Sequence, residues 1–296
     1  MNIQQYFTEN KKKIDAALMD ITAEDPSTPK VLKEAMEYSL KAGGKRLRPI
    51  LAIAASEAAG GEAGRVLPFA CALEMIHTFS LIHDDLPAMD DDDFRRGLPT
   101  NHKVFGEGIA VLAGDGLLAL AFEMLSHCSV KNGIDPRRLL EVIGDLAEAT
   151  GPAGMVGGQI LDLKGEGASL DAAALENVHR FKTGRLISVS VTGGAKIAGA
   201  DSEKLEALKN YGDKIGLAFQ IADDILNVEG DAKTLGKSVG SDAKNGKSTY
   251  PALLGLQASK AKARELVSEA IAALDGFTAA ADPLRGIAEY VVLRKN

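Results

Sequence analysis

The sequence is poor in cysteine and proline and contains no tryptophan, and these shortages limit what the protein can be. Its two cysteines, Cys71 and Cys128, both lie in apolar stretches, which excludes a secreted scaffold stapled by disulfides. We therefore predict a reducing, cytoplasmic location with both thiols in the core. With 10 prolines in 296 residues, no Pro-, Gly- or Ser-rich linker divides the chain. A single domain spanning residues 1–296 is predicted.

Charge and hydrophobic runs exclude two further classes. A net charge of -7 argues against nucleic acid as the main partner. The N-terminal segment lacks the uninterrupted apolar stretch of a signal peptide, and no apolar run approaches the length that spans a bilayer. We predict a soluble globular protein without membrane insertion, since 46% of the residues are hydrophobic and 25% are charged.

The periodicity of the apolar residues is helical almost throughout, recurring at i, i+3, i+4 and i+7. Asp135 followed by Pro136 has the pattern of a helix cap and a first helical residue. Gly151 and Gly184 are expected to end helices. Only LISVSV at 186–191 resembles a strand. The prediction is an all-α fold with roughly ten or more helices and no sheet of consequence.

An acidic segment follows the apolar stretch ALEMIHTFSLI. Residues 81–97 read LIHDDLPAMDDDDFRRG, with six aspartates within ten residues and then two arginines. Like charges at this density repel one another. Either positive groups complete a site here, or the segment is a solvated loop.

A second acidic segment favours the site. In IGLAFQIADDILNV (215–228), Gln220, Asp223 and Asn227 are spaced i, i+3 and i+7, with Asp224 beside them. At about 100° per residue these side chains share one helix face. A polar stripe is ordinarily the solvent side of a helix, but here the flanking positions are apolar on most sides. Carboxylates on a buried helix need a partner such as a metal ion.

Oxygen-only clusters without Cys or His at ligand spacing favour a hard cation such as Mg²⁺, with substrate phosphates supplying further ligands. Two facing clusters could clamp a diphosphate through bridging ions. Basic groups in loops and at helix ends would complete the phosphate sites. Any one of them alone is more typical of a solvated surface, but the set favours phosphate binding: Lys45, Arg48, Arg95, Arg96, Lys182 with Thr183, Lys237 and Lys247.

Together these segments resemble the trans-prenyl diphosphate synthase family, most closely its bacterial-type farnesyl diphosphate synthase branch. DDLPAMDDDDFRRG is similar to the first aspartate-rich motif and ADDILN to the second. GGKRLRP, FKTG at 181–184, Gln159 in GGQILDL and GKSTYPALLG match further family segments, so the resemblance covers nearly the whole chain. Asn227 departs from the family pattern, which commonly has Asp there, and Asp223 is the safer direct ligand.

The resemblance implies an all-α fold of the isoprenoid synthase type around a central cavity, a homodimer, and three Mg²⁺ ions per active site. It implies metal ligation by Asp84, Asp90 and Asp223, supported by Asp85 and Asp224. The allylic substrate, dimethylallyl and then geranyl diphosphate, would contact Arg95, Lys182, Thr183, Gln220, Lys237 and Lys247. Of these, the catalytic set would be Lys182, Thr183, Gln220 and Lys237. Isopentenyl diphosphate would bind Gly44, Lys45, Arg48, His77 and Arg96.

The implied reaction is the condensation of isopentenyl diphosphate with an allylic carbocation, giving farnesyl diphosphate. A lone His is usually a core residue, but His77 precedes Asp84 by two helical turns on the same face, which favours the site. The resemblance also implies that Phe79 and Ser80 determine product length. Ser80 lies directly beneath Asp84, whereas Phe79 lies about 140° around the helix, so its ring must lean across the cavity or a helix bend must turn it inward.

Three alternatives follow from the same sequence. A geranylgeranyl diphosphate synthase is the main one, and a non-catalytic partner subunit of a longer-chain synthase is another. A P-loop nucleotide binder is suggested by NGKST at 245–249, but Ser241 stands where that motif needs Gly, and the preceding strand is missing.

Overall fold

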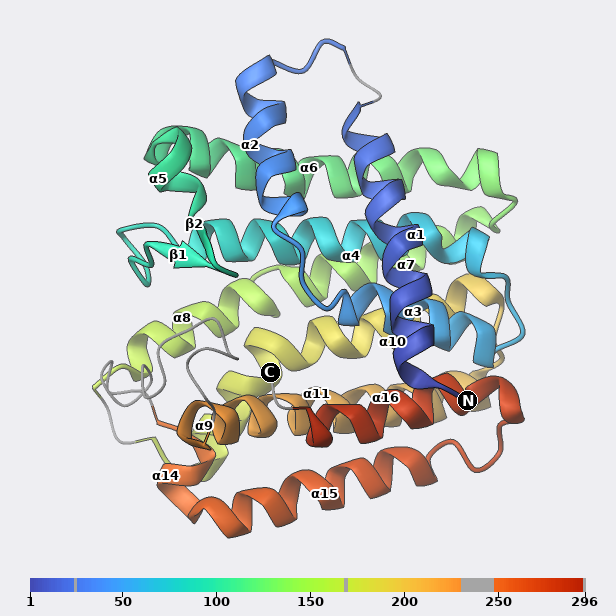
Figure 1. Ribbon diagram of the computed structural model, residues 1–296. Helices are drawn as coiled ribbons and strands as arrows, with labels where there is room; N and C mark the ends of the chain where they lie inside the picture. The colour runs from blue at the N-terminus through green and yellow to red at the C-terminus, as the bar shows by residue number, and fades with distance from the viewer. Residues whose placement is uncertain (24–25, 168–169, 230–247, 295–296) are drawn as a thin grey trace.

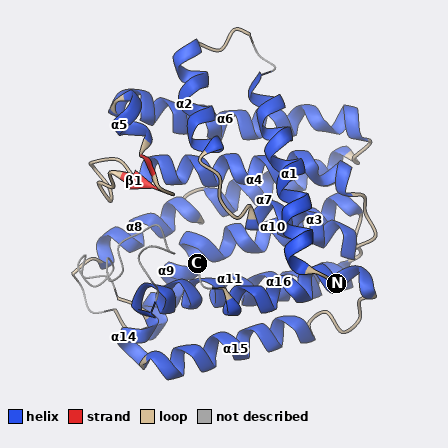
Figure 2. Cartoon of the chain, viewed as in Figure 1, coloured by secondary structure: helices blue, strands red, loops and turns tan. Residues whose placement is uncertain are grey.

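In a computed structural model, which describes residues 1–23, 26–167, 170–229 and 248–294, the chain is helical almost from end to end (Figures 1 and 2). Side chains are described except at residues 23 and 128–132, so Cys128 lies outside the described side chains. The all-α prediction is confirmed. Strands in the described ranges amount to one antiparallel pair of two-residue segments, β1 (Phe94–Arg95) and β2 (Leu98–Pro99).

The described helices begin in the first half of the chain with α1 (Ile3–Ala23), α2 (Lys30–Lys41), α3 (Leu47–Ala58), α4 (Ala63–Asp84), α5 (Asn101–Phe105), α6 (Glu107–Asn132) and α7 (Pro136–Thr150). They continue with α8 (Met155–Gly165), α9 (Ala172–His179), the π-helical turn η1 (Arg180–Gly184), α10 (Arg185–Ala198), α11 (Ser202–Glu229), α14 (Tyr250–Leu254), α15 (Leu256–Ala272), the 3₁₀ turn η2 (Ala279–Ala281) and α16 (Asp282–Leu293).

The core lies where α3 packs against α4 and α10, and α10 against α11 (Figure 1). Every residue of α3 except Arg48 and Glu57 is buried, because LRPILAIAASEA presents small or apolar side chains on all faces. Glycine permits the close approach of α10, since a Cβ at Gly194 would lie 2.2 Å from the Ala52 carbonyl oxygen. This packing fixes α4 and α11, the two helices that carry the acidic segments.

The local predictions have mixed outcomes. Asp135 caps α7 by accepting from the N–H groups of Arg137 and Arg138, and α7 ends at Gly151 as expected. Gly184 does not end a helix, because η1 runs directly into α10. The close approach here depends on Gly216 of α11 instead, since a Cβ at that residue would lie 2.9 Å from the Gly184 Cα. LISVSV is part of α10, and its strand-like appearance was misleading.

The expectation about apolar runs needs a correction. Judged by length and hydropathy alone, α4 and the Glu107–His127 part of α6 are long and apolar enough to cross a membrane. This is weak evidence, because a core helix passes the same test, and 67% of the α4 window is buried inside the protein.

Candidate active site

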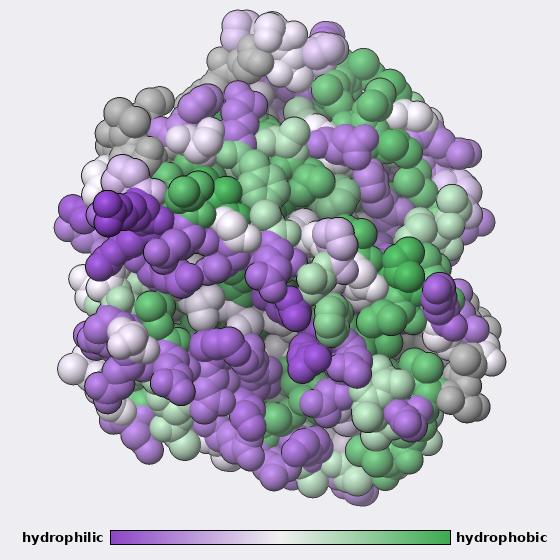
Figure 3. Space-filling view, turned by 180° about the vertical axis from the view of Figure 1, so that it is seen from behind, coloured by the Kyte–Doolittle hydropathy of each residue, from purple (hydrophilic) through white to green (hydrophobic). Residues whose placement is uncertain are grey.

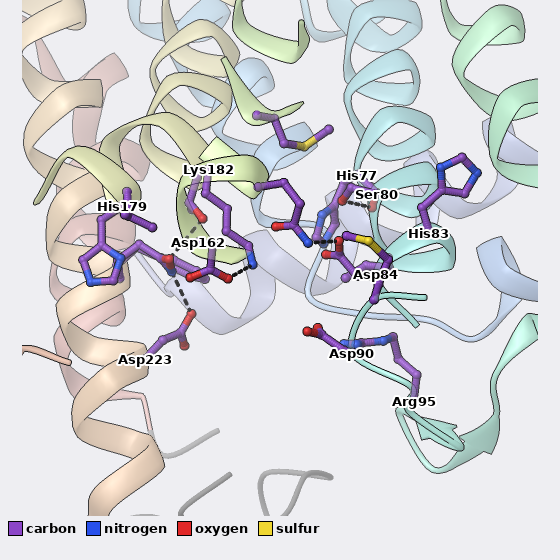
Figure 4. Close-up of a pocket in the computed structure, with 18 of the residues that line it drawn as sticks. His77, Ser80, His83, Asp84, Asp90, Arg95, Asp162, His179, Lys182 and Asp223 are labelled. Atoms are coloured by element: carbon purple, nitrogen blue, oxygen red, sulfur yellow. Dashed lines mark hydrogen bonds and ion pairs between the residues drawn. The ribbon is translucent and has the colours of Figure 1, made fainter. Parts of the chain in front are cut away.

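A cavity of about 1010 Å³ reaches into the middle of the helical bundle. Its lining comes from segments far apart in sequence: the loop before α3, the C-terminal half of α4, the acidic loop after it, α8, η1, α11 and the end of the chain. Figure 4 shows Asp84 and Asp90 on one side, His179 and Asp223 on the other, and Asp162 with Lys182 between them. The two acidic segments therefore share one cavity.

The first acidic segment turns back on itself at the end of α4. The N–H of Asp90 donates to the carbonyl of Asp84 at 2.9 Å, and both residues line the cavity. Burial raises the pKa of Asp84 to about 6; Lys182 opposes the shift, while the charges of Asp90 and Asp85 add to it. Keeping this carboxylate ionised is therefore costly unless a cation is bound beside it.

Asp85 points elsewhere. Its Oδ1 accepts from the guanidinium of Arg95 at 2.5 Å, and the residue is only 4% exposed. Arg95 also pairs with Asp92 at 3.2 Å. The cavity lining includes Arg95 but not Asp85. This pair offsets part of the acidic charge and holds Arg95 at the rim, next to the place where a bound anion would lie.

The second acidic segment lies on α11, where no residue from 214 to 227 is exposed. This agrees with the prediction that the polar stripe belongs to a buried helix. Asp223 Oδ1 accepts from Arg294 at 2.6 Å. Asp224 Oδ2 accepts from the N–H of Tyr250 at 2.9 Å and lies 3.2 Å from His179 Nε2. Gln220, Asp223, Asp224 and Asn227 all line the cavity.

Lys182 and Thr183 are presented by the π-helical turn η1. Lys182 Nζ pairs with Asp162 of α8 at 2.7 Å, and Thr183 Oγ1 donates to Gln220 of α11 at 3.1 Å. Glycine lets α8 approach this turn, because a Cβ at Gly158 would lie 2.2 Å from the Lys182 backbone nitrogen. These contacts place one cation and one hydroxyl between the two acidic segments.

A cationic corner is formed by the loop before α3. Burial, helped by the nearby charge of Arg294, lowers the pKa of Lys45 to about 8. Burial also lowers the pKa of Arg48, and its buried Nε has no hydrogen-bond partner among the described residues. Burial, together with the positive charges of Arg48 and Arg96, lowers the pKa of His77 well below its ordinary value, so the ring is neutral. An anion bound in this corner would stabilise these positive charges.

Two side chains hold the backbone of this loop. Arg96 donates to the carbonyl of Gly43, and Lys11 of α1 donates to that of Gly44 at 2.7 Å. Gly44 has φ +129, and a Cβ there would lie 2.6 Å from the Arg96 guanidinium, so glycine is required. Arg46 adopts a left-handed backbone and buries its guanidinium against Glu74.

Part of the cavity lining, here called the apolar end, consists mainly of apolar side chains. Phe79 and Ser80 both line it, together with Val111 of α6 and Met155, Val156 and Ile160 of α8. Phe79 is 8% exposed, and Ser80 donates to the His77 carbonyl at 2.8 Å, which satisfies its hydroxyl locally. This end suits a hydrocarbon chain below Asp84.

Lys237 and Lys247 lie outside the described residues. Three residues of the site were missed from the sequence: Asp162, His179 and Arg294. Asp162 could have been found from the sequence, because it follows Gln159 by three residues and therefore shares its face of α8. The structure places Gln159 in the site, where it donates to Asp84 at 2.5 Å. Arg294 gave no signal, since a basic residue near a chain end is ordinarily solvated.

Comparison with known proteins agrees with this geometry. The model of the polyprenyl synthetase family matches residues 29–282. The chain belongs to this family. It is 50% identical over 262 residues to a farnesyl diphosphate synthase of Geobacillus stearothermophilus, covering 88% of each chain. It is 46% identical to a chloroplastic geranylgeranyl pyrophosphate synthase of Capsicum annuum, covering all of this chain and 79% of that protein.

Among solved structures, an FPP/GFPP synthase from Zymomonas mobilis superposes with a TM-score of 0.87 at 39% identity, covering 98% of this chain and 99% of the other. As a polyprenyl synthetase family member with relatives of this similarity, the protein is a prenyltransferase. The family resemblance seen in the sequence is confirmed. The relatives differ in the product length that their names state, so the product of this chain is a separate question.

Proposed function

We propose that this prenyltransferase makes farnesyl diphosphate, by adding isopentenyl diphosphate first to dimethylallyl diphosphate and then to geranyl diphosphate. One observation carries the proposal: two acidic segments and a cationic loop, remote in sequence, line a single cavity whose other end is apolar. The two acidic segments suit a diphosphate that is bound through metal ions, and the cationic corner suits a diphosphate without metal ions. The apolar end suits a prenyl chain.

The allylic diphosphate would lie between α4 and α11. Asp84, Asp90 and Asp223 would hold Mg²⁺, while Asp224, already bonded to Tyr250, would keep α11 oriented. Within the described residues no three acidic, His or Cys side chains gather closely enough to chelate an ion by themselves. That fits Mg²⁺, which takes few protein carboxylates and completes its shell with phosphate and water. We expect three such ions.

The remaining contacts to the allylic diphosphate would come from the rim and from η1. Arg95 and Lys182 bring positive charge, and Thr183 and Gln220 bring hydrogen-bonding groups linked to each other. Lys182 would exchange its bond with Asp162 for the substrate. Lys237 and Lys247 are proposed to act in the same half of the site on the strength of their sequence motifs.

Isopentenyl diphosphate would occupy the cationic corner. The buried, unpaired Nε of Arg48 is a donor without an acceptor among the described residues, and a phosphate oxygen would satisfy it. Lys45 and Arg96 add charge, and the neutral His77 adds a donor. Gly44 allows the substrate to approach the backbone. This diphosphate does not leave during the reaction, so these groups bind it rather than activate it.

Mg²⁺, when bound, supplies positive charge that stabilises the leaving diphosphate. Lys182 and Arg95 share that work by holding the phosphate oxygens as negative charge develops. The allylic C–O bond breaks, the isopentenyl double bond attacks the resulting carbocation, and a proton passes to the released diphosphate. Met155, which lines the cavity and is 7% exposed, would help to keep water from the cation.

We also propose one domain, a homodimer and a cytoplasmic location. Among the described residues, all buried apolar side chains except Val178 belong to one cluster, which supports one domain. The α6 window is apolar, yet only 39% of it is buried. Figure 3 shows apolar patches between polar regions on one face of the molecule. The exposed apolar residues include several on α5, α6 and α8: Val104, Val111, Leu112, Val156 and Ile160. A second copy of the chain would cover this surface.

A geranylgeranyl product is the second candidate, favoured by the similarity to the Capsicum annuum protein. Purified protein should be incubated with Mg²⁺, isopentenyl diphosphate and dimethylallyl diphosphate, and the products dephosphorylated and separated by chromatography. The proposal expects farnesol as the main alcohol. Geranylgeraniol as the main alcohol would move the chain to the second candidate, and the absence of any prenyl alcohol would refute both.

A further inference from the structure

One contact at the apolar end of the cavity has no part in the proposed roles. His83 follows Phe79 by one turn of α4, and their rings meet edge to face, with centroids 4.8 Å apart and planes at 75°. Both residues line the cavity. In Figure 4 the side chain of His83 points away from the central site, toward the neighbouring green helix.

The imidazole is fixed to α6. Its Nε2 lies 3.0 Å from the carbonyl oxygen of Val111, so this nitrogen carries the proton and donates it. Gly114, almost one turn further along α6, leaves room for the ring: a Cβ there would lie 2.3 Å from His83 Nε2. A glycine notch and a backbone carbonyl of α6 thus hold the ring of His83.

We propose that His83 is a specificity-determining residue that braces the ring of Phe79 across the path of the growing chain, and this rests on the proposed function. Phe79 does not lie beneath Asp84 on the helix, yet its ring lines the cavity while it packs edge to face on His83. His83, on the same face and anchored to a second helix, blocks the swing of that ring toward α6. The floor of the cavity, meaning the barrier that stops the growing prenyl chain, is therefore formed by two side chains, Phe79 and His83.

The first test is His83→Ala. Removing the imidazole gives the Phe79 ring room beside α6 and opens the floor. The share of C20 and longer products should rise by roughly tenfold, the usual discrimination of a filled apolar pocket. The rate of the first condensation should stay at the wild-type value. The Mg²⁺ concentration giving half-maximal rate should also be unchanged, which separates this role from a disturbance of Asp84.

The second test acts from the other helix. In Gly114→Ala the new methyl group occupies the notch and forces the imidazole toward the cavity, so the product distribution should move in the opposite direction, toward C10. In the His83→Ala background the same methyl group has no ring to displace and should add nothing. Gly108→Ala is the matched control, because it lies on α6 as well and a Cβ there meets nothing within 4 Å.

The outcomes distinguish a failure of the proposed function from a failure of the proposed role of His83. If the wild type forms no prenyl product, the proposed function fails. If the wild type forms C15 and His83→Ala forms the same products at the same rate, the brace is wrong while the proposed function stands. If His83→Ala loses its fold or all activity, Gly114→Ala decides: an unchanged product distribution in that variant overturns the inference.

Discussion

Replacing Asp84 with Asn should abolish turnover and, at the same time, stabilise the metal-free protein. Burial is the main reason that the Asp84 pKa rises from 3.8 to about 6. Each pKa unit corresponds to about 1.4 kcal/mol, so the ionised carboxylate costs the folded state up to about 3 kcal/mol at pH 7. Because the side chain is not fully shielded from water, we expect a gain of about 1–3 kcal/mol, or several degrees in Tm.

The pH dependence follows from the direction of this shift. Between pH 4 and 6 the folded wild type binds more protons than the unfolded chain, so its stability falls as the pH rises through that window. The advantage of Asp84→Asn should therefore be full at pH 7 and vanish below pH 4. Thermal unfolding in a chelator, at fixed scan rate and several pH values, measures this difference.

Asp91→Asn is the matched control, since Asp91 lies in the same acidic segment, is exposed, and has φ 50, a conformation that Asn tolerates. Its Tm should stay close to that of the wild type. Adding Mg²⁺ with inorganic pyrophosphate should reverse the order, stabilising the wild type more than Asp84→Asn. An Asp84→Asn protein that is less stable at pH 7, or an advantage that does not change with pH, would refute the electrostatic reasoning.

Four further outcomes are expected. A chelator should abolish turnover and excess Mg²⁺ should restore it, and Asp223→Ala should lose orders of magnitude in kcat while remaining folded. Lys45→Ala and Arg48→Ala should raise KM mainly for isopentenyl diphosphate, whereas Lys182→Ala should mainly lower kcat; equal effects on both substrates would contradict this division. Because the pKa of Lys45 is about 8, the KM for isopentenyl diphosphate should rise above that pH in the wild type, but not in Lys45→Arg. Phe79→Ala should yield C20 or longer products, and an unchanged C15 product from an active variant would place the floor elsewhere.

The sequence alone determined the helical fold and the chemistry of the site, because both depend on local pattern. Apolar spacing at the helical period identified α11, and the spacing of Gln220, Asp223 and Asn227 is sufficient to place them on one face of it. The acidic residues and the glycines of GGKRLRP were visible for the same reason: the residue type and its neighbours carry the signal.

The tertiary structure alone decided which partner each charge has. Arg294 reaches Asp223 from the far end of the chain, and Asp224 bonds to Tyr250 and His179 on other helices. Gly184 has the local pattern of a helix end, but η1 runs through it into α10. Ion pairs, glycine notches and the contact of His83 with α6 join residues whose separation along the chain carries no periodic signal. They arise only when the buried faces of the helices pack together, and local pattern cannot encode that arrangement.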